Sequence, residues 1–495
     1  MIMKTDKLYS ADFGFDEPFE FALGKGEVFH AEKVVRIIPK RRMVAFGQWQ
    51  GQPTVAKLFF DKKRAKRHME KELAGVSALQ KSHIPSPELL GEFMTEDCSC
   101  RVLLFKQIAA TSLDVLWQNK RHISEILLIL HAVMVELATQ HVMGVLQRDL
   151  HLKNFLIELL EDPFDSHEAT QERVRVYTLD GGQIEMFPAL LAKKESMSSV
   201  ALFLSQLGAG MESYQQLLFR YYAKQRGWII KRSDIIELFK LIGNWGAERW
   251  QRYERKIWRD STDFAKISRW TATTVFDRKY TGPDFIRLLS HPDMAFTGAH
   301  ALILKAGRSC TVAKVTLDGR EFVVKRYNIK GFFHWLRRAL RPTRAASCWR
   351  LAQKLKLFQV PTAQPAAYIE NRCLGLRGKS YFIMEHVHAY HMGQYLDAHS
   401  NNPEILGAVT ARVTTLLKNL LKLNVTHGDL KMTNILIDAD DQPLLIDLDG
   451  MREHDSHASL RKTWRKEAQR FLRNFSGQAS LREGFMQSLR DIRLI

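Results

Sequence analysis

The sequence predicts an α+β protein in which one unit, a small β-rich lobe followed by a helical lobe, occurs twice in tandem. A loop with an Asp and an Asn five residues apart occurs in VLQRDLHLKNFLI, residues 145–157, and again in VTHGDLKMTNILI, residues 425–437. A long stretch with apolar residues at helical spacing precedes each loop, and a strand-like segment with a lysine lies upstream of each helix. We therefore expect two related domains, over residues 1–260 and 261–495.

The divide between the halves is placed between residues 258 and 290. There the chain loses clear periodicity and carries a Gly-Pro break. No low-complexity linker marks the divide, which leaves close packing of the halves open.

Composition restricts the class of protein. With 495 residues, of which 45% are hydrophobic and 26% charged, the chain can bury more than one core. The five cysteines are too few and too scattered for a disulfide framework, which favours a reducing, cytoplasmic compartment. No apolar signal segment begins the sequence and no uncharged apolar run reaches about 18 residues, so we expect neither export nor a membrane span.

The net charge of +19 favours anionic partners. Basic runs lie at residues 39–42, 62–68, 335–344 and 461–475. The last run fits either a packed terminal helix with a solvated basic face, which we favour, or a helix lying on a membrane surface. No helix-turn-helix or zinc pattern accompanies the basic runs, so we do not expect nucleic-acid binding.

Each β-rich segment places a lysine within a strand. QGQPTVAKLFF puts Lys57 after a Gly-Gln-Pro turn, and TVAKVTLDGREFVVKRYN puts Lys325 after an Asp-Gly hairpin turn. A lysine at such a position can hold the phosphates of a nucleotide, although one strand lysine alone is weak evidence.

The loop of the second half carries the side chains that phosphoryl transfer requires. Asp429 is the candidate base, and Asn434 has the spacing of the metal-binding Asn in the protein-kinase loop H-R-D-L-x-x-x-N. Lys431 can reach the transferring phosphate. Asp447 follows an apolar strand, where the Asp of a kinase D-F-G motif binds Mg²⁺, and Asp449 stands at the position of that motif's Gly.

The first half offers the same set with substitutions. Lys57 has an expected ion-pair partner in Glu72, with Glu70 as the alternative. Asp149 is the candidate base, and Asn154 and Asp180 are the candidate metal ligands.

Three features of the first-half loop depart from the second. Gln147 replaces the loop histidine, His151 stands at the place of Lys431, and an acidic insertion over residues 161–176 separates Asn154 from the strand before Asp180.

The second half resembles the bacterial lipopolysaccharide kinase (Kdo/WaaP) family, within the protein-kinase-like superfamily, over roughly residues 290–475. The resemblance rests on the segment VVKRYN…RPTRAASCW…VPTAQPAAYIE, on THGDLKMTNILI and on LLIDLDGMREHD. It implies a two-lobed kinase fold with ATP and Mg²⁺ bound between the lobes. By this resemblance Lys325 binds ATP, Asp429 is the base, and Asn434 and Asp447 bind the metal.

One position departs from the kinase pattern. Aligning VPTAQP (360–365) with IPSPEL (84–89) puts Cys348 where a helix glutamate is expected to pair with the strand lysine. Either Lys325 is held differently or the second half is impaired, so activity in one half or in both stays open.

The expected function is ATP-dependent phosphorylation of a hydroxyl on an inner-core sugar of lipopolysaccharide, heptose or Kdo. The expected partner is the lipopolysaccharide core or lipid A precursor, met by a cytoplasmic protein at the inner face of the cytoplasmic membrane, where basic residues favour anionic surfaces. A Ser/Thr or other small-molecule kinase, and a tandem pseudokinase adaptor, are the alternatives. The sequence leaves the sugar, its hydroxyl and the oligomeric state undecided.

Two further groups suggest metal binding only weakly. His386, His388, His391 and His399 fall where the segment after an inter-lobe strand is expected, and Cys98 and Cys100 lack a second cysteine pair. We expect no zinc site at either.

Overall fold

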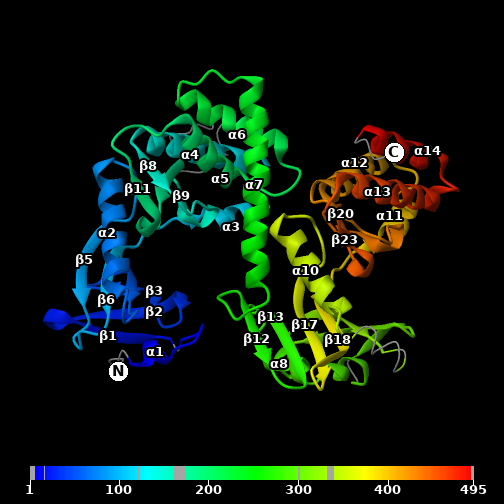
Figure 1. Cartoon of the computed structure of the whole chain (residues 1–495), viewed down its shortest axis with the longest axis horizontal. Coiled ribbons are helices and arrows are strands. Elements are labelled where there is room, and N and C mark those ends of the chain that lie inside the picture. The colour runs from blue at the N-terminus through cyan, green and yellow to red at the C-terminus, as the bar shows by residue number, and fades with distance from the viewer. Residues whose placement is uncertain are drawn as a thin grey trace. The chain divides into compact units, whose positions relative to one another are not determined.

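The computed structural model describes residues 6–15, 17–119, 123–160, 174–298, 301–329, 331 and 339–491. Most of the acidic insertion, residues 161–173, and residues 335–338 of the basic run at 335–344 lie outside these ranges. The chain divides into two compact units, Met1–Leu207 with Met211–Glu248, and Gly208–Gly210 with Arg249–Ile495 (Figure 1). Both contain helices and strands, in keeping with an α+β protein.

A six-stranded sheet in the order β1-β2-β3-β4-β6-β5 begins the first unit, with each neighbouring pair antiparallel. Its strands are β1 (Phe19–Leu23), β2 (Glu27–Ile38), β3 (Arg42–Trp49), β4 (Gln52–Phe59), β5 (Leu89–Met94) and β6 (Arg101–Lys106). Gln50 and Gly51, both with positive φ, make the tight turn into β4, which carries Lys57. Helix α2 (Ala65–Lys81) follows β4 and carries Glu72.

The helical part of the first unit surrounds the Asp149 loop. The elements are α3 (Leu113–Gln118), α4 (Ile123–Val142), β7 (Thr111–Ser112), β8 (Val145–Gln147), η2 (Leu152–Asn154), β9 (Phe155–Leu159), β10 (Val174–Thr178), η4 (Gly181–Gln183), β11 (Ile184–Met186), α5 (Lys193–Leu204), α6 (Glu212–Gln225) and α7 (Arg232–Lys256), whose last residues belong to the second unit. Helix α4 is long and apolar enough to cross a membrane by length and composition, and half of its most apolar stretch is buried. Its Ile129, Val133 and Leu137 belong to the core of this unit.

A seven-stranded antiparallel sheet begins the second unit, in the order β12-β13-β17-β18-β16-β15-β14. Its strands are β12 (Phe264–Ser268), β13 (Ala272–Asp277), β14 (Leu302–Ala306), β15 (Cys310–Leu317), β16 (Arg320–Tyr327), β17 (Pro365–Cys373) and β18 (Leu376–Glu385). The expected Asp-Gly hairpin turn is present, since Asp318 and Gly319 both have positive φ between β15 and β16. Lys325 lies on β16, paired with Phe382 of β18.

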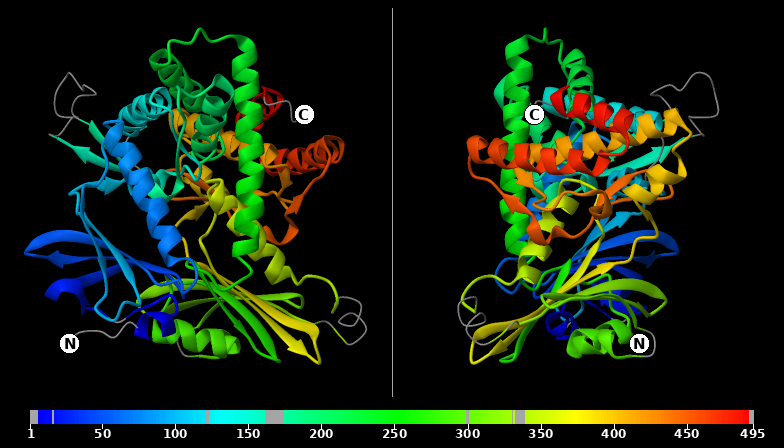
Figure 2. Two further views of the ribbon diagram at one scale, coloured as in Figure 1. Left: turned by 60° about the vertical axis from the view of Figure 1, so that its left-hand side comes forward. Right: turned by 90° about the vertical axis from the view of Figure 1, so that its right-hand side faces the viewer.

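The helices of the second unit include one that packs against the sheet and a group that forms the helical part. Helix α8 (Pro283–Ser290) follows β13, and α10 (Arg344–Leu357), capped by Thr343, contacts β17 and β18. The helical part holds β19 (Tyr390–His391), α11 (Met392–Ala398), α12 (Pro403–Lys422), β20 (Val425–Thr426), η6 (Met432–Asn434), β21 (Ile435–Ile437), β22 (Pro443–Leu445), η7 (Leu448–Gly450), β23 (Arg452–Glu453), α13 (His457–Leu472) and α14 (Ala479–Asp491). Figure 2 shows α12, α13 and α14 gathered together, and both α12 and α13 contact α14.

The basic run at residues 461–475 forms most of α13. Its apolar residues Trp464, Phe471 and Phe475 are buried in the core of the second unit, while Arg465 and Lys466 are exposed. The favoured interpretation, a packed helix with a solvated basic face, is therefore confirmed, because the apolar face that a membrane-surface helix needs is already covered.

Candidate active site

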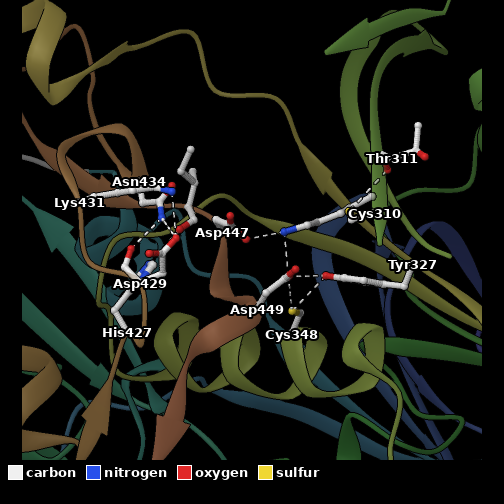
Figure 3. Close-up of polar contacts among 12 residues, drawn as sticks. Cys310, Thr311, Tyr327, Cys348, His427, Asp429, Lys431, Asn434, Asp447 and Asp449 are labelled. Carbon is white, nitrogen blue, oxygen red and sulfur yellow. Dashed lines mark hydrogen bonds and ion pairs between the residues drawn. The ribbon is translucent and has the colours of Figure 1, made fainter. Parts of the chain in front are cut away.

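The loop between β20 and β21 brings Asp429, Lys431 and Asn434 together (Figure 3). Asn434 Nδ2 donates to the Asp429 carbonyl at 2.8 Å and to its Oδ2 at 3.3 Å, and Lys431 Nζ lies 3.0 Å from the same Oδ2. The Asp429 carboxylate is 43% exposed, so an acceptor hydroxyl can approach it. This geometry suits a base whose carboxylate is oriented by a neighbouring amide and a cation.

The buried side chains of His427 and Glu467 fix the backbone around the Asp429 loop. His427 Nε2 lies 2.9 Å from the Ile446 carbonyl, and Glu467 of α13 accepts hydrogen bonds from the backbone amides of His427 and Gly428. Burial of Glu467 raises its pKa to about 7 even though these amides oppose the shift. Gly428 has a φ of +82°, and a Cβ there would lie 2.1 Å from the Gly450 carbonyl oxygen, so only glycine fits.

Asp447 follows β22 in the left-handed conformation and points at Lys325. Lys325 Nζ lies 2.5 Å from Asp447 Oδ1. Burial alone would raise the pKa of Asp447, but the Lys325 ammonium lowers it, so Asp447 is a carboxylate at neutral pH. A small pocket beside the pair has an apolar wall that includes Ala363, Phe382 and Ile446.

Asp449 completes a polar network around Lys325, and Figure 3 shows its carboxylate beside Tyr327 and Cys348. Its Oδ1 lies 2.8 Å from Lys325 Nζ and accepts hydrogen bonds from Tyr327 Oη at 2.5 Å and Cys348 Sγ at 3.3 Å. Burial opposes protonation of Lys325, yet the carboxylates of Asp449 and Asp447 raise its pKa above the ordinary value, so it stays charged. Burial raises the pKa of Cys348 as well, so its thiol is protonated and can donate to Asp449.

This network resolves the question that Cys348 raised. Cys348 lies on α10, in a helix that contains no acidic residue, and the carboxylate next to Lys325 comes instead from Asp449 of η7. Sequence reasoning noted Asp449 only as a replacement for a glycine. The signal was present in the Asp-Leu-Asp spacing, but only the fold shows that the second carboxylate reaches the lysine. Glu467 was also missed, because an acidic residue in a basic helix gives no sequence signal of its own.

In the first unit, the strand lysine has the expected helix partner. Lys57 forms an ion pair with Glu72, whose side chain is 2% exposed, and Glu72 Oε2 also accepts a hydrogen bond from the Gly182 amide at 3.0 Å. The alternative partner, Glu70, is exposed and lies near Lys66.

The Asp149 loop repeats the backbone pattern of the Asp429 loop. The Asn154 carbonyl accepts from the Leu179 amide at 2.7 Å, and the Asn434 carbonyl accepts from the Ile446 amide at 3.1 Å. Asp180, like Asp447, follows in the left-handed conformation.

The residues that differ between the loops keep some of the same contacts. Gln147 donates to the Leu179 carbonyl at 2.8 Å, which is the place that His427 takes at Ile446 in the second unit. His151 is partly buried, and this burial lowers its pKa, so it does not supply the positive charge that Lys431 has. The Asn154 side-chain Oδ1 accepts from the His151 amide at 2.9 Å, so the two asparagine side chains are not held alike.

Backbone hydrogen bonds support the alignment of residues 360–365 with residues 84–89, which placed Cys348 at the expected glutamate position. The Thr178 amide donates to the Pro85 carbonyl at 2.8 Å, and the Leu445 amide donates to the Pro361 carbonyl at 3.0 Å. Each donor lies two residues before the strand-ending Asp of its unit, so the two prolines are structurally equivalent.

The oxygen donors of the second unit fit a magnesium ion. Asn434 uses its Nδ2 on Asp429, which leaves Oδ1 for a cation, and Asp447 uses one oxygen on Lys325, which leaves the other. Carboxylate and amide oxygens are the ligands that Mg²⁺ prefers.

Comparison with known proteins bears on the second unit alone. Residues 305–486 match the model of the lipopolysaccharide kinase (Kdo/WaaP) family. The matched range contains Lys325, Asp429, Asn434 and Asp447, and it ends within α14. No curated protein matches the chain.

Proposed function

We propose that the protein is an ATP- and Mg²⁺-dependent phosphotransferase that phosphorylates a hydroxyl on an inner-core sugar of lipopolysaccharide, heptose or Kdo. One observation carries the proposal. The range that matches the lipopolysaccharide kinase (Kdo/WaaP) family contains a strand lysine paired with a strand-ending aspartate, Lys325 with Asp447, and a loop in which Asn434 donates to Asp429.

Each residue of the second unit has a role in this reaction. Asp429 orients the acceptor hydroxyl and takes its proton as the sugar oxygen bonds to the γ-phosphorus and ADP leaves. Lys325 binds the α- and β-phosphates, and Lys431 binds the transferring phosphoryl group. Asn434 and Asp447 would hold Mg²⁺, which would offset the negative charge that builds on the phosphate oxygens.

We further propose that each unit is a kinase-like domain, with the domains at residues 1–260 and 261–495. The equivalent prolines, the left-handed Asp180 and Asp447, and the matching backbone bonds of the two loops support this. In the first unit Asp149 would be the base, Asn154 and Asp180 the metal ligands, and Lys57 and Glu72 the nucleotide-binding pair.

The acceptor and its location rest on the family match and on charge. A lipopolysaccharide precursor is anionic and lipid-anchored, and a chain with a net charge of +19 is attracted to such a surface. We place the reaction at the inner face of the cytoplasmic membrane, with the protein bound peripherally.

The experiment that tests the proposal is transfer of labelled phosphate from ATP to purified, dephosphorylated lipopolysaccharide core. Intact protein is compared with Asp149→Ala, Asp429→Ala and the double variant, with the exposed Asp455→Ala as the matched control. We expect transfer by the intact protein and by the control, and a loss of at least about 100-fold in Asp429→Ala.

The other outcomes separate the alternatives. Loss of phosphate transfer in Asp149→Ala but not in Asp429→Ala would assign catalysis to the first unit. Phosphate transfer to protein or to another small molecule, without transfer to lipopolysaccharide core, would show that the acceptor is not a core sugar. Absence of transfer together with absence of thermal stabilisation by ATP and Mg²⁺ favours an adaptor, because a ligand of the folded state raises its stability.

A further inference from the structure

A cluster of two histidines and a glutamate lies at the edge of the second unit's sheet, where β16 begins and β18 ends. His386 follows β18, His388 lies two residues further on, and Glu321 lies near the start of β16. The three ligand atoms lie within 4.8 Å of one another. All three side chains belong to the second unit.

The sheet register brings these residues together. Phe322 pairs with Glu385 across the antiparallel strands, which makes Glu321 and His386 the next cross-strand neighbours, and the His386 amide donates to the Glu321 carbonyl at 2.9 Å. Cross-strand neighbours project from the same face of a sheet. The backbone pairing therefore places Glu321 beside His386 whatever the side chains do.

Both imidazoles converge on one carboxylate oxygen. His386 Nδ1 and His388 Nε2 each lie 3.0 Å from Glu321 Oε2, and the two rings are nearly perpendicular, with an interplanar angle of 86°. Lys314 Nζ lies 2.8 Å from the other oxygen, Oε1, and so fixes the carboxylate with Oε2 toward the histidines.

Two of these atoms lack a hydrogen-bond partner. Glu321 Oε2 and His386 Nδ1 are inaccessible to water and, among the described residues, make no hydrogen bond of acceptable geometry, although they lie 3.0 Å apart. Unsatisfied buried polar atoms carry a free-energy cost of about 1–3 kcal/mol, which either a proton shared by the pair or a bound cation relieves. Tetrahedral ligands at about 2.0–2.1 Å from zinc are separated by about 3.3 Å, close to the spacing seen here.

We propose that Glu321, His386 and His388 form a binding site for a divalent transition-metal ion such as Zn²⁺. Two imidazoles and one carboxylate are ligands that such ions bind, with a fourth position left for water. A neutral imidazole is the form that binds a metal ion. The ion links β16, which carries Lys325, to the segment that leads into the helical part of the unit.

The other histidines of this stretch do not take part. His391 Nδ1 accepts from the Gln394 amide at 3.2 Å, and His399 stacks on Tyr395 with its ring centroid 4.2 Å away. The sequence interpretation set all four histidines aside because they fall in one inter-lobe segment. The proposal departs from it because Glu321, which supplies the third ligand, lies more than sixty positions earlier and joins them only through the sheet.

The test is zinc binding by the full chain after chelation, followed by calorimetry with Zn²⁺ and by cobalt substitution. We expect one tight site, a tetrahedral Co²⁺ absorption spectrum, and loss of both in His388→Ala, with affinity at least about 10-fold weaker in Glu321→Gln. The His388 side chain is 80% exposed, so the first substitution leaves the fold intact. His30→Ala is the matched control, because His30 belongs to the first unit and its Nδ1 pairs with a single carboxylate oxygen, Glu20 Oε1, at 2.9 Å.

Zinc bound by the carboxylates of the nucleotide site is distinguished by the same variants, since that binding survives in His388→Ala and is lost in Asp447→Asn. Binding with unchanged stoichiometry and affinity in both His388→Ala and Glu321→Gln overturns the proposal. Absence of any binding tighter than about 100 µM also overturns it, and shows that the cluster is an ion pair between Glu321 and protonated histidine.

Discussion

Lys325 and Asp449 lie 2.8 Å apart in a network that also contains Asp447, Tyr327 and Cys348. In the first unit the corresponding lysine, Lys57, pairs with Glu72 of a helix. The carboxylate beside the lysine is therefore retained in both units, but it comes from different elements of the chain. Loss of the helix glutamate does not by itself leave Lys325 without a partner.

Replacing Asp449 with Ala should leave Lys325 paired with Asp447 alone. The lysine is then drawn toward Asp447, the proposed metal ligand. We expect weaker nucleotide binding together with a loss of stability of up to about 3 kcal/mol, because a buried charge loses one of its partners. Calorimetry with ATP and Mg²⁺, and urea unfolding, measure the two effects.

The double variant Cys348→Glu with Asp449→Gly tests whether nucleotide affinity depends on which element supplies the carboxylate that pairs with Lys325. It moves the carboxylate from η7 to α10, as in the first unit, and we expect it to recover nucleotide affinity relative to Asp449→Gly alone. The Cys348→Ser variant is the control for disturbing the helix. Equal affinity in Asp449→Gly and the intact protein would show that the lysine does not depend on this carboxylate.

His427→Gln should be tolerated, because the first unit has Gln147 at the equivalent place. Gln147 Nε2 donates to the Leu179 carbonyl at 2.8 Å, and His427 Nε2 lies 2.9 Å from the Ile446 carbonyl. We expect a loss below about 1 kcal/mol for Gln and about 2 kcal/mol or more for His427→Ala, which leaves a cavity and removes the hydrogen bond. Urea midpoints of the two variants compare them directly, and equal losses would contradict the expectation.

Glu467 should make stability depend on pH. Its pKa is raised from 4.5 in the unfolded chain to about 7 in the folded protein. The folded state therefore binds the proton more tightly, so the stabilisation by protonation is present below about pH 4.5 and is lost as the pH rises to about 7. Across that window we expect the free energy of unfolding to fall by up to about 3 kcal/mol relative to Glu467→Gln, whose amide does not titrate.

Urea unfolding of both proteins at intervals from pH 5 to pH 8 measures this difference. Curves that stay parallel over the whole range would show that Glu467 is ionised throughout, held by the amides of His427 and Gly428.

Glu72→Gln tests the first unit without touching the second. The substitution keeps the shape of the side chain and its acceptor for the Gly182 amide but removes the charge that faces Lys57. We expect about a 10-fold loss of nucleotide affinity at one of two sites if both units bind ATP. Glu70→Gln, on the exposed side of the same helix, is the control. A single nucleotide site unaffected by Glu72→Gln would confine binding to the second unit.

The sequence alone determined the local features, because they depend on residues close together in the chain. The Asp-Gly hairpin before Lys325, the helix with buried Trp464, and the loop that sets Asn434 against Asp429 follow from turn chemistry, periodicity and spacing. The range matched by the family model, residues 305–486, contains the catalytic and metal-binding residues expected in the second half.

Tertiary structure alone decided which distant side chains meet. Lys325 and Asp449 are 124 positions apart, and whether a carboxylate from η7 or from α10 reaches the lysine depends on how the helix packs on the sheet. The same holds for Glu467 beneath His427, and for Glu321 beside His386. These contacts form only when β-sheet register and helix packing close long loops, and no pattern within a window of sequence encodes that closure.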